Sequence, residues 1–394
     1  MRIGLYIYKL GFGGAERVVC RTSQILQRKD HHVFIITDEK VDAAYDYAGD
    51  YINLDIPHNI HGFRSLLLFL KRIKALRHIK KINDLDVVIS FLVQPNIVNI
   101  LSVKKGCRCF VSIRNRFISE NNNSVFKKLF FKLEKVLYKK ADGVISVSNL
   151  INNEVIKYFN VPAEKSYTLY NPYDMETIIS ESKKTLDLQM GKILSDSTFK
   201  FVSTGRFTYQ KGFWHLIKAF AEVHKMEPNT KLVLIGDGEL KSKIMQLIKD
   251  LGIEDSVILP GFRKDVFSIE SKCNVYVMTS LFEGFPNALT EAMCLGLPII
   301  TTDCKSGPKE ILAPEMNLDK IITEPMLIKY GYLIPELETD ENFESQVMTE
   351  AEIQLSNTML KMIRISFDNT VIKERAMYFS EENYYTILNN IITP

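Results

Sequence analysis

The sequence predicts an α/β protein with two parallel β-sheets, one in each half of its 394 residues. Short apolar segments alternate with amphipathic helical segments, which is the pattern of βαβ units. This alternation stops once near the middle of the chain and then starts again. A chain of this length is sufficient for two domains of ordinary size.

Five short apolar segments in the first half are the predicted strands of the first sheet. They are RIGLYIY, HVFIIT, DVVISFL, CFVSI and GVISVS, with helices expected at residues 16–27, 65–81, 126–140 and 149–159. The alternation ends in LYNPYD, where Asn171-Pro172 disfavours regular structure. We therefore expect a first domain over residues 1–172, followed by a polar linker over residues 173–198.

Five further apolar segments predict the second sheet. They are KFVSTG, KLVLIG, SVILPG, VYVMTS and PIITT. Helical segments separate them, so a second domain is expected over residues 199–376. No apolar run approaches the ~20 residues that a membrane-spanning helix requires, and the glycine-rich N-terminus is unlike a signal peptide. The six cysteines form no CxxC pair, so they are expected to be reduced in a cytoplasm.

The net charge of +3 conceals an uneven distribution. Residues 1–172 carry 27 Lys and Arg against 15 Asp and Glu, a net charge of +12, and the remainder carries 23 against 32, a net charge of −9. A basic first half predicts an anionic partner, such as a membrane surface, a diphosphate lipid or a nucleic acid. Segments 65–81 and 126–140 combine Leu and Phe with many cations, as helices on anionic membranes do. The alternative is that both are ordinary outer helices of βαβ units.

Two glutamates separated by seven residues, Glu283 and Glu291, lie in the string EGFPNALTEAMCLGLPII. Pro286 suits the first position of a helix, so Glu283 is expected in the loop before that helix and Glu291 within it. The first backbone amides of the helix suit an anion, and carboxylates accept hydrogen bonds from sugar hydroxyls. The string therefore predicts a sugar-nucleotide site. The alternative is a turn glutamate and a solvated helix glutamate.

A glycine and two cations follow the first strand of the second sheet. Gly205-Arg206 comes directly after the strand, and Lys211 follows five residues later. Ligands of open α/β folds bind at the carboxyl ends of the strands. Two cations there can neutralise a departing diphosphate without a metal. Asp84-Leu85-Asp86 matches a metal-binding DxD by letters but precedes a strand, so no metal site is predicted.

The first strand of the chain also leads into a glycine-rich loop that includes Gly13 and Gly14. Glycines allow close backbone approach, and a helix N-terminus favours an anion. The loop lacks the third glycine of a dinucleotide fingerprint, although Asp38 stands near the position of the acidic residue that NAD binding needs. A basic loop with Arg114 and Asn115 follows the fourth strand.

Together these motifs resemble the family 4 (group 1) retaining glycosyltransferases, a large family that includes bacterial surface-polysaccharide glycosyltransferases. The resemblance covers nearly the whole chain and is most specific over residues 199–312. It implies a GT-B fold, in which two Rossmann-like domains face each other across a cleft. It also implies that residues 377–394 form a helix that crosses back onto the N-terminal domain.

The resemblance implies roles for individual residues. Catalytic roles fall to Glu283, Arg206 and Lys211, with Glu283 on the donor sugar and the two cations on the leaving diphosphate. The expected donor-binding residues are Gly205, Arg263, Phe285, Pro286, Asn287, Ala288, Leu289 and Glu291, of which Glu291 would hold the ribose. The residues expected to face the acceptor or a phosphate are Gly13, Gly14, Arg114 and Asn115.

The implied reaction transfers a hexosyl or N-acetylhexosaminyl group from a nucleoside diphosphate sugar, UDP-linked, to a lipid-diphosphate-linked sugar in O-antigen or capsule assembly. The implied enzyme needs no cofactor and no metal. It would work in the cytoplasm at the anionic inner face of the cell membrane, and no nucleic-acid partner is expected. Two alternatives stay open: a UDP-sugar 2-epimerase of the same fold, or a non-catalytic nucleotide-sugar-binding protein.

Overall fold

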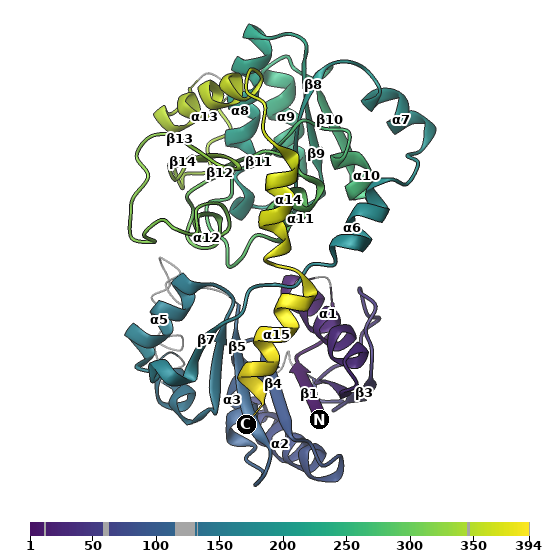
Figure 1. Cartoon of the computed structure of the whole chain (residues 1–394), viewed down its shortest axis with the longest axis vertical. Helices are drawn as coiled ribbons and strands as arrows, with labels where there is room; N and C mark the ends of the chain where they lie inside the picture. The colour runs from purple at the N-terminus through teal and green to yellow at the C-terminus, as the bar shows by residue number, and fades with distance from the viewer. Residues whose placement is uncertain (12, 58–62, 115–130, 132, 345–346, 394) are drawn as a thin grey trace. The chain divides into compact units, whose positions relative to one another are not determined.

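The computed structural model describes residues 1–394 except residues 12, 58–62, 115–130, 132, 345–346 and 394. The chain divides into two compact units (Figure 1). The first unit comprises Met1–Pro172 and Glu381–Pro394, and the second comprises Tyr173–Ser380. Among the described residues each unit contains a seven-stranded sheet. The predicted α/β class with two sheets is therefore confirmed.

The sheet of the first unit is parallel throughout, in the order β3-β2-β1-β4-β5-β6-β7. Its strands are β1 (Arg2–Ile7), β2 (His32–Thr37), β3 (Asp50–Asn53), β4 (Val87–Phe91), β5 (Arg108–Ile113), β6 (Gly143–Ser146) and β7 (Ser166–Thr168). Five of them correspond to predicted strands. The edge strands β3 and β7 were not predicted. Their sequences, DYIN and SYT, are short and partly polar and contain no continuous apolar run.

Helices cover both faces of this sheet. They are α1 (Gly14–Arg28), α2 (Phe63–Ile82), α3 (Val93–Leu101), α5 (Asn149–Phe159) and α15 (Glu381–Ile392). On β1, Ile3 and Leu5 pack in one core cluster with residues of α1 and α15, whereas Tyr6 packs in a second cluster with residues of α2 and α3. A parallel strand that is buried on both faces reads as a continuous apolar run, which is why β1 was predictable.

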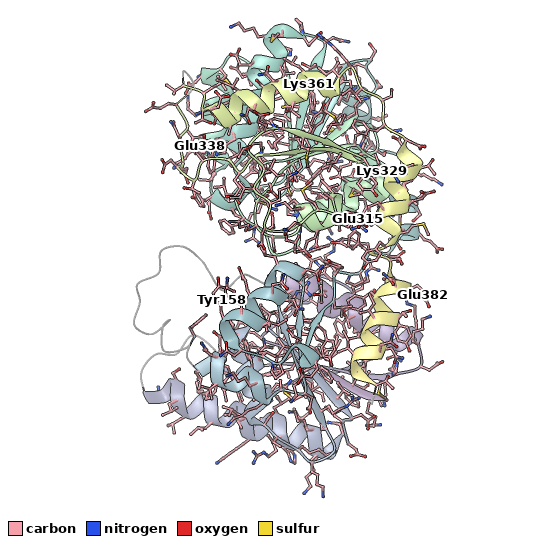
Figure 2. The ribbon with its side chains drawn as sticks, turned by 60° about the vertical axis from the view of Figure 1, so that its left-hand side comes forward. Tyr158, Glu315, Lys329, Glu338, Lys361 and Glu382 are labelled. Atoms are coloured by element: carbon pink, nitrogen blue, oxygen red, sulfur yellow. The ribbon has the colours of Figure 1, made fainter. Side chains whose placement is uncertain are left out.

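The C-terminal helix α15 packs against α1 within the first unit (Figure 1). Its residues Tyr384, Leu388 and Ile392 recur every four positions and are buried in the core with β1. The Tyr384 hydroxyl lies 2.8 Å from Thr22 Oγ1. Ion pairs join Arg21 and Arg28 of α1 to Glu381, and Lys29 to Glu382, which is labelled in Figure 2. The helix begins at Glu381 rather than at the predicted 377, because α14 continues to Met377 and belongs to the second unit.

The second sheet has the order β10-β9-β8-β11-β12-β14-β13, and only its last pair is antiparallel among the described strands. Its strands are β8 (Phe199–Thr204), β9 (Thr230–Ile235), β10 (Val257–Gly261), β11 (Val275–Met278), β12 (Ile299–Thr302), β13 (Met326–Ile328) and β14 (Gly331–Ile334). Its helices are α6 (Met175–Ser182), α7 (Leu188–Leu194), α8 (Phe213–Met226), α9 (Lys241–Asp250), α10 (Val266–Glu270), α11 (Asn287–Leu295), α12 (Pro308–Leu312), α13 (Glu350–Met362) and α14 (Asn369–Met377).

The segment predicted as a linker, residues 173–198, is a structured part of the second unit. It contains α6 and α7, and an aspartate caps the N-terminus of each: Asp174 accepts from Thr177 N at 2.9 Å and Asp187 from Met190 N at 2.8 Å. Helix α6 packs against α10 and α11. The prediction of a linker was wrong because these helices are short and bury few side chains, so they lack the apolar periodicity of a core helix.

Two cations of α2 are buried rather than exposed. Arg72 Nε donates to Asp38 Oδ2 at 2.9 Å, and the Tyr6 hydroxyl donates to Asp38 Oδ1 at 2.7 Å. Lys80 Nζ donates to the carbonyls of Asn99 and Ser102, and burial lowers the pKa of this ammonium group. Asp38 is completely buried, so it is not available to a ribose, and this removes the remaining support for NAD binding. Within the described ranges, no helix is both long and apolar enough to cross a membrane.

Replacing Asp38 with Ala should destabilise the protein, because Arg72 would stay buried without its carboxylate. Breaking a buried pair from one side typically costs about 3–5 kcal/mol of unfolding free energy. Urea unfolding followed by far-UV circular dichroism measures this loss. The control is Asp50→Ala, which removes an exposed contact with His32 in the same unit and should leave the midpoint nearly unchanged. Equal midpoints for the two variants would contradict the importance of the buried pair.

Candidate functional site

Three loops of the second unit meet at the carboxyl ends of its central strands. One follows β8, one follows β9 and one follows β11, and parallel strands place these ends along one edge of the sheet. The first and third loops are joined directly: Leu281 N donates to Gln210 O at 2.8 Å, and Thr279 Oγ1 donates to Lys211 O at 3.1 Å. The predicted residues Arg206, Lys211 and Glu283 therefore belong to one assembly of loops.

Lys211 and Glu283 form an ion pair at the centre of this assembly. Lys211 Nζ lies 2.7 Å from Glu283 Oε1, and the Glu283 side chain is 9% exposed. Ser280 Oγ donates to the same oxygen at 2.8 Å, and Gln210 Nε2 donates to Oε2 at 3.2 Å. Three donors thus fix the orientation of one carboxylate. The sequence predicted Lys211 and Glu283 separately; it did not predict that they pair, nor that Gln210 and Ser280 hold the carboxylate.

Backbone hydrogen bonds fix the residues on both sides of Arg206. Gly205 N donates to Ile235 O at 3.0 Å, and Phe207 N donates to Asp237 O at 2.9 Å, so the loop after β8 runs alongside the loop after β9. The Phe207 ring is buried in the core, whereas Arg206 is exposed. The backbone around Arg206 is therefore fixed on both sides, and the residue itself is exposed.

Glycines make this close packing of loops possible. Gly236 has a φ of +151°, and a Cβ on it would lie 1.9 Å from Gly205 O. A Cβ on Gly307, whose φ is +102°, would lie 2.5 Å from Pro286 Cδ. No side chain fits at either position, so both loops depend on glycine.

The segment from Phe285 to Leu289 builds the N-terminus of α11. Phe285, Pro286 and Leu289 are buried, and Phe285 packs edge-on against Phe379 with ring centroids 5.5 Å apart. Asn287 Oδ1 accepts from the Tyr173 hydroxyl at 2.7 Å. Helix α11 begins at Asn287, so Pro286 is the residue before it rather than its first residue. Pro286 also lacks a backbone N–H and cannot supply one of the predicted amide donors, which leaves the amides around it.

Glu291 lies inside α11, a little more than one turn from its start, and is 7% exposed. Its charge helps to raise the pKa of the buried Glu270. Arg263 follows β10, and its guanidinium donates to Asp265 at 2.7 and 2.8 Å and to Asp187 at 2.6 Å. The Arg263 guanidinium is therefore paired with two carboxylates. Arg263 would contact a donor sugar nucleotide through its backbone groups.

The predicted residues of the first unit lie at the carboxyl edge of the first sheet. Gly13 precedes α1, and a Cβ on it would lie 2.1 Å from the carboxylate of Glu16; the exposed Gly14 begins the helix. Arg114 follows β5, and its guanidinium donates to the Asn171 side chain. Asn115 lies outside the described residues.

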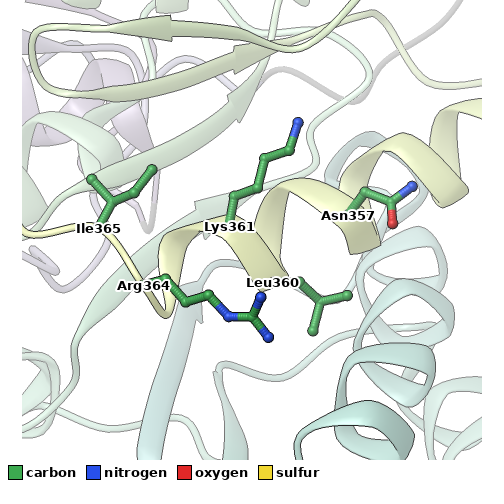
Figure 3. A pocket seen from close by; sticks show the side chains of 5 residues that line it. All are labelled: Asn357, Leu360, Lys361, Arg364 and Ile365. Carbon is green, nitrogen blue, oxygen red and sulfur yellow. The ribbon is translucent and has the colours of Figure 1, made fainter.

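Other candidates do not form a site. Asp84 pairs with Lys104, and Asp86 accepts from Arg2 N at 2.7 Å. In the described part of the chain, no three His, Cys, Asp or Glu side chains are grouped as metal ligands would be. A surface hollow of about 560 Å³ lies at the end of α13 (Figure 3). Its lining contains none of the predicted site residues and consists of Asn357, Leu360, Lys361, Arg364 and Ile365.

The family model "Glycosyltransferase Family 4" matches residues 12–177, and the model "Glycosyl transferases group 1" matches residues 188–341. The chain is similar to the lipopolysaccharide outer core galactosyltransferase WaaB, with a TM-score of 0.69 and 21% identity over 100% of this chain and 99% of that chain. The fold is therefore GT-B, as predicted.

Two relatives with named activities are similar to most of this chain. The N-acetylgalactosamine-N,N'-diacetylbacillosaminyl-diphospho-undecaprenol 4-alpha-N-acetylgalactosaminyltransferase of Campylobacter jejuni is 30% identical over 323 residues, which are 80% of this chain and 84% of that protein. The UDP-Gal:alpha-D-GlcNAc-diphosphoundecaprenol alpha-1,3-galactosyltransferase of Escherichia coli is 25% identical over 296 residues, 74% of this chain and 76% of that protein. The chain belongs to the group 1 glycosyltransferases, which confirms the predicted family.

Replacing Gly236 with Ala should destabilise the second unit, because the new methyl group would overlap the carbonyl of Gly205. Trp214 is the only tryptophan and is buried in the core of this unit, so its fluorescence reports urea unfolding there. The control is Gly252→Ala, which also has a positive φ but nothing within 4 Å of the added Cβ. The control should lose about 1–2 kcal/mol of unfolding free energy through backbone strain alone. A Gly236→Ala variant no less stable than the control would contradict the close approach of the loops.

Proposed function

We propose that this protein is a retaining glycosyltransferase that moves a hexosyl or N-acetylhexosaminyl group from a UDP-linked sugar to a hydroxyl of a lipid-diphosphate-linked sugar, in the assembly of a surface polysaccharide. The observation that carries the proposal is the Lys211–Glu283 pair beside Arg206, at the carboxyl edge of the second sheet. The names of these two relatives support the substrate classes, because both include a sugar carried on diphosphoundecaprenol and one includes UDP-galactose.

We assign the leaving diphosphate and the donor sugar to different side chains of the site. Arg206 and Lys211 are cations on one loop, suited to the charge that develops on a leaving diphosphate. Glu283 is held by three donors, which gives its carboxylate a single orientation in which to position the donor sugar. Glu291 on α11 and the amides at the start of that helix complete the proposed donor site.

In the proposed reaction the bond between the anomeric carbon and the diphosphate oxygen breaks. A bond to the acceptor hydroxyl oxygen forms on the same face of the sugar, and the hydroxyl proton passes to the departing diphosphate. The protein then needs no base of its own. Because side-chain cations balance the diphosphate charge, we propose that neither a metal nor an organic cofactor takes part.

Replacing Arg206 or Lys211 with Ala should lower the turnover of a UDP-sugar by about 10²–10³, the usual effect of removing one contact with transition-state charge. The assay measures UDP release from a panel of UDP-sugars with a diphosphoundecaprenol-linked acceptor, and it contains EDTA so that a metal requirement would be seen. Lys249→Ala, a change at an exposed lysine of the same unit, should keep wild-type turnover.

Four outcomes would count against this proposal. Full activity of both the Arg206→Ala and Lys211→Ala variants would reject the role in leaving-group stabilisation. Activity that EDTA abolishes and Mg²⁺ or Mn²⁺ restores would reject the metal-free mechanism. UDP-sugar binding without turnover for any acceptor would favour a non-catalytic binding protein, and conversion of the donor sugar itself would favour an epimerase.

We further propose that the first unit binds the anionic inner face of the cell membrane through α2. Leu66, Leu67 and Leu70 on this helix are about half exposed. Lys71, Lys74 and Lys81 are exposed on the same helix, at spacings that continue the stripe of Leu67 and Leu70. Apolar side chains beside cations suit a headgroup region. Of the second predicted membrane helix, most of residues 126–132 lie outside the described residues.

Replacing Lys71, Lys74 and Lys81 together with Gln should weaken binding to phosphatidylglycerol vesicles about 100-fold at low salt, since each cation contributes about 1 kcal/mol. Co-sedimentation measures the effect. The control carries the same change at three exposed lysines of the second unit: Lys225, Lys249 and Lys361, of which Lys361 is labelled in Figures 2 and 3. If the wild-type protein does not bind these vesicles, or if both variants lose the same amount of binding, α2 is an ordinary outer helix.

A further inference from the structure

Glu270 is a completely buried acid beneath the candidate site, and the proposed reaction does not use it directly. It is the last residue of α10. Its Oε1 accepts a hydrogen bond from Thr204 Oγ1 at 2.6 Å, and its Oε2 has no hydrogen-bond partner among the described residues. Thr204 is the last residue of β8 and directly precedes Gly205-Arg206. Among the described residues, the one hydrogen bond of the Glu270 carboxyl therefore reaches the start of the loop that carries Arg206.

The titratable groups near Glu270 lie on β11, on α11, in the turn before β11 and on α6. On β11 the Tyr276 hydroxyl donates to Thr204 O at 3.3 Å, so Thr204 is held from two sides. On α11 the negative charge of Glu291 acts on Glu270. Cys273 lies in the turn before β11, and burial raises the pKa of its thiol. On α6, Glu181 pairs with Lys184 at 2.6 Å and contributes its backbone carbonyl to Ser268 of α10.

These surroundings favour the protonated form of Glu270. Burial raises the pKa of its carboxyl to about 8; the hydrogen bond from Thr204 works against this shift, and the charge of Glu291 adds to it. A buried carboxylate is costly without a cation or several donors. Ionisation would also add a second negative charge beside Glu291, in the part of the unit where the anionic diphosphate of a donor is expected.

We propose that Glu270 is a positioning residue that works as an uncharged acid: it holds Thr204, and through it the Arg206 loop, and its ionisation weakens the binding of a nucleoside diphosphate. This inference rests on the proposed function, because it assumes that the Arg206 loop receives the diphosphate. It adds to the site a residue that the sequence motifs do not include. It also predicts that the affinity for the donor falls as the pH rises.

The sign of the effect on stability follows from the raised pKa. Between about pH 4.5, the ordinary value for the carboxyl, and about pH 8, the folded protein keeps a proton on Glu270 that the unfolded chain releases. The contribution of the uncharged acid to stability is therefore complete below this window and is lost as the pH rises through it. A Gln at this position stays neutral, so the stability of Glu270→Gln relative to wild type should increase with pH across the window.

The experiment compares wild type, Glu270→Gln and the control Glu254→Gln, which makes the same change at an exposed glutamate of the same unit. Melting temperatures without ligand, from about pH 5 to about pH 9, test whether Glu270 is uncharged. The affinity for UDP, measured by calorimetry from about pH 7 to about pH 9, tests the effect on the site. Wild type and Glu254→Gln should lose affinity about tenfold over this range, whereas Glu270→Gln should stay nearly constant.

A wild-type affinity that does not change with pH would overturn the inference, as would an equal decline in Glu270→Gln. If Glu270→Gln does not fold, the Thr204→Val variant tests the same inference. This variant removes the hydrogen bond that lowers the pKa of Glu270, so the decline in affinity should move to higher pH, and an unmoved decline would overturn the inference. No UDP binding by wild type at any pH would instead reject the proposed function, and with it this role in donor binding.

Discussion

The second unit depends on the contact between Lys211 and Glu283, because this ion pair joins two loops that are far apart in the sequence. Lys211 belongs to the loop after β8 and Glu283 to the loop after β11. The carboxylate is satisfied by an ammonium, a hydroxyl and an amide, so it can be held away from bulk water without a large desolvation penalty. The same loops are tied by backbone contacts, and glycines at their closest approaches leave no room for adjustment. A fixed arrangement of charges of this kind is what a group-transfer site requires.

The sequence was most informative where burial on both faces of a sheet produced continuous apolar runs. All ten predicted strands are present, and the break after residue 172 marks a boundary of the first unit. Prediction failed where structure rests on few side chains. The edge strands β3 and β7 carry mixed polarity, and α6 and α7 depend on aspartate caps and a handful of buried residues. Such elements are stabilised by their surroundings, which a local pattern does not contain.

The candidate site shows the same limit. Motifs identified Lys211 and Glu283 because each stands in a recognisable string. Gln210 and Ser280 have no such signal, since their hydrogen bonds to Glu283 depend on how two loops meet in space. The cations of α2 were counted together in the sequence, yet Arg72 and Lys80 are internal partners of a carboxylate and of backbone carbonyls. Composition gives the number of charges but does not distinguish surface charges from structural ones.

The docking of α15 has a consequence for the order in which the chain can fold during synthesis. The first unit begins at Met1, but its core also contains Tyr384, Leu388 and Ile392. Domains generally fold as units in the order in which they leave the ribosome. Here the second unit is complete in the sequence before the first one is, because α15 follows the second unit along the chain. The core of the first unit is therefore complete only after α15 has been synthesised, and until then the surface that α15 covers stays exposed.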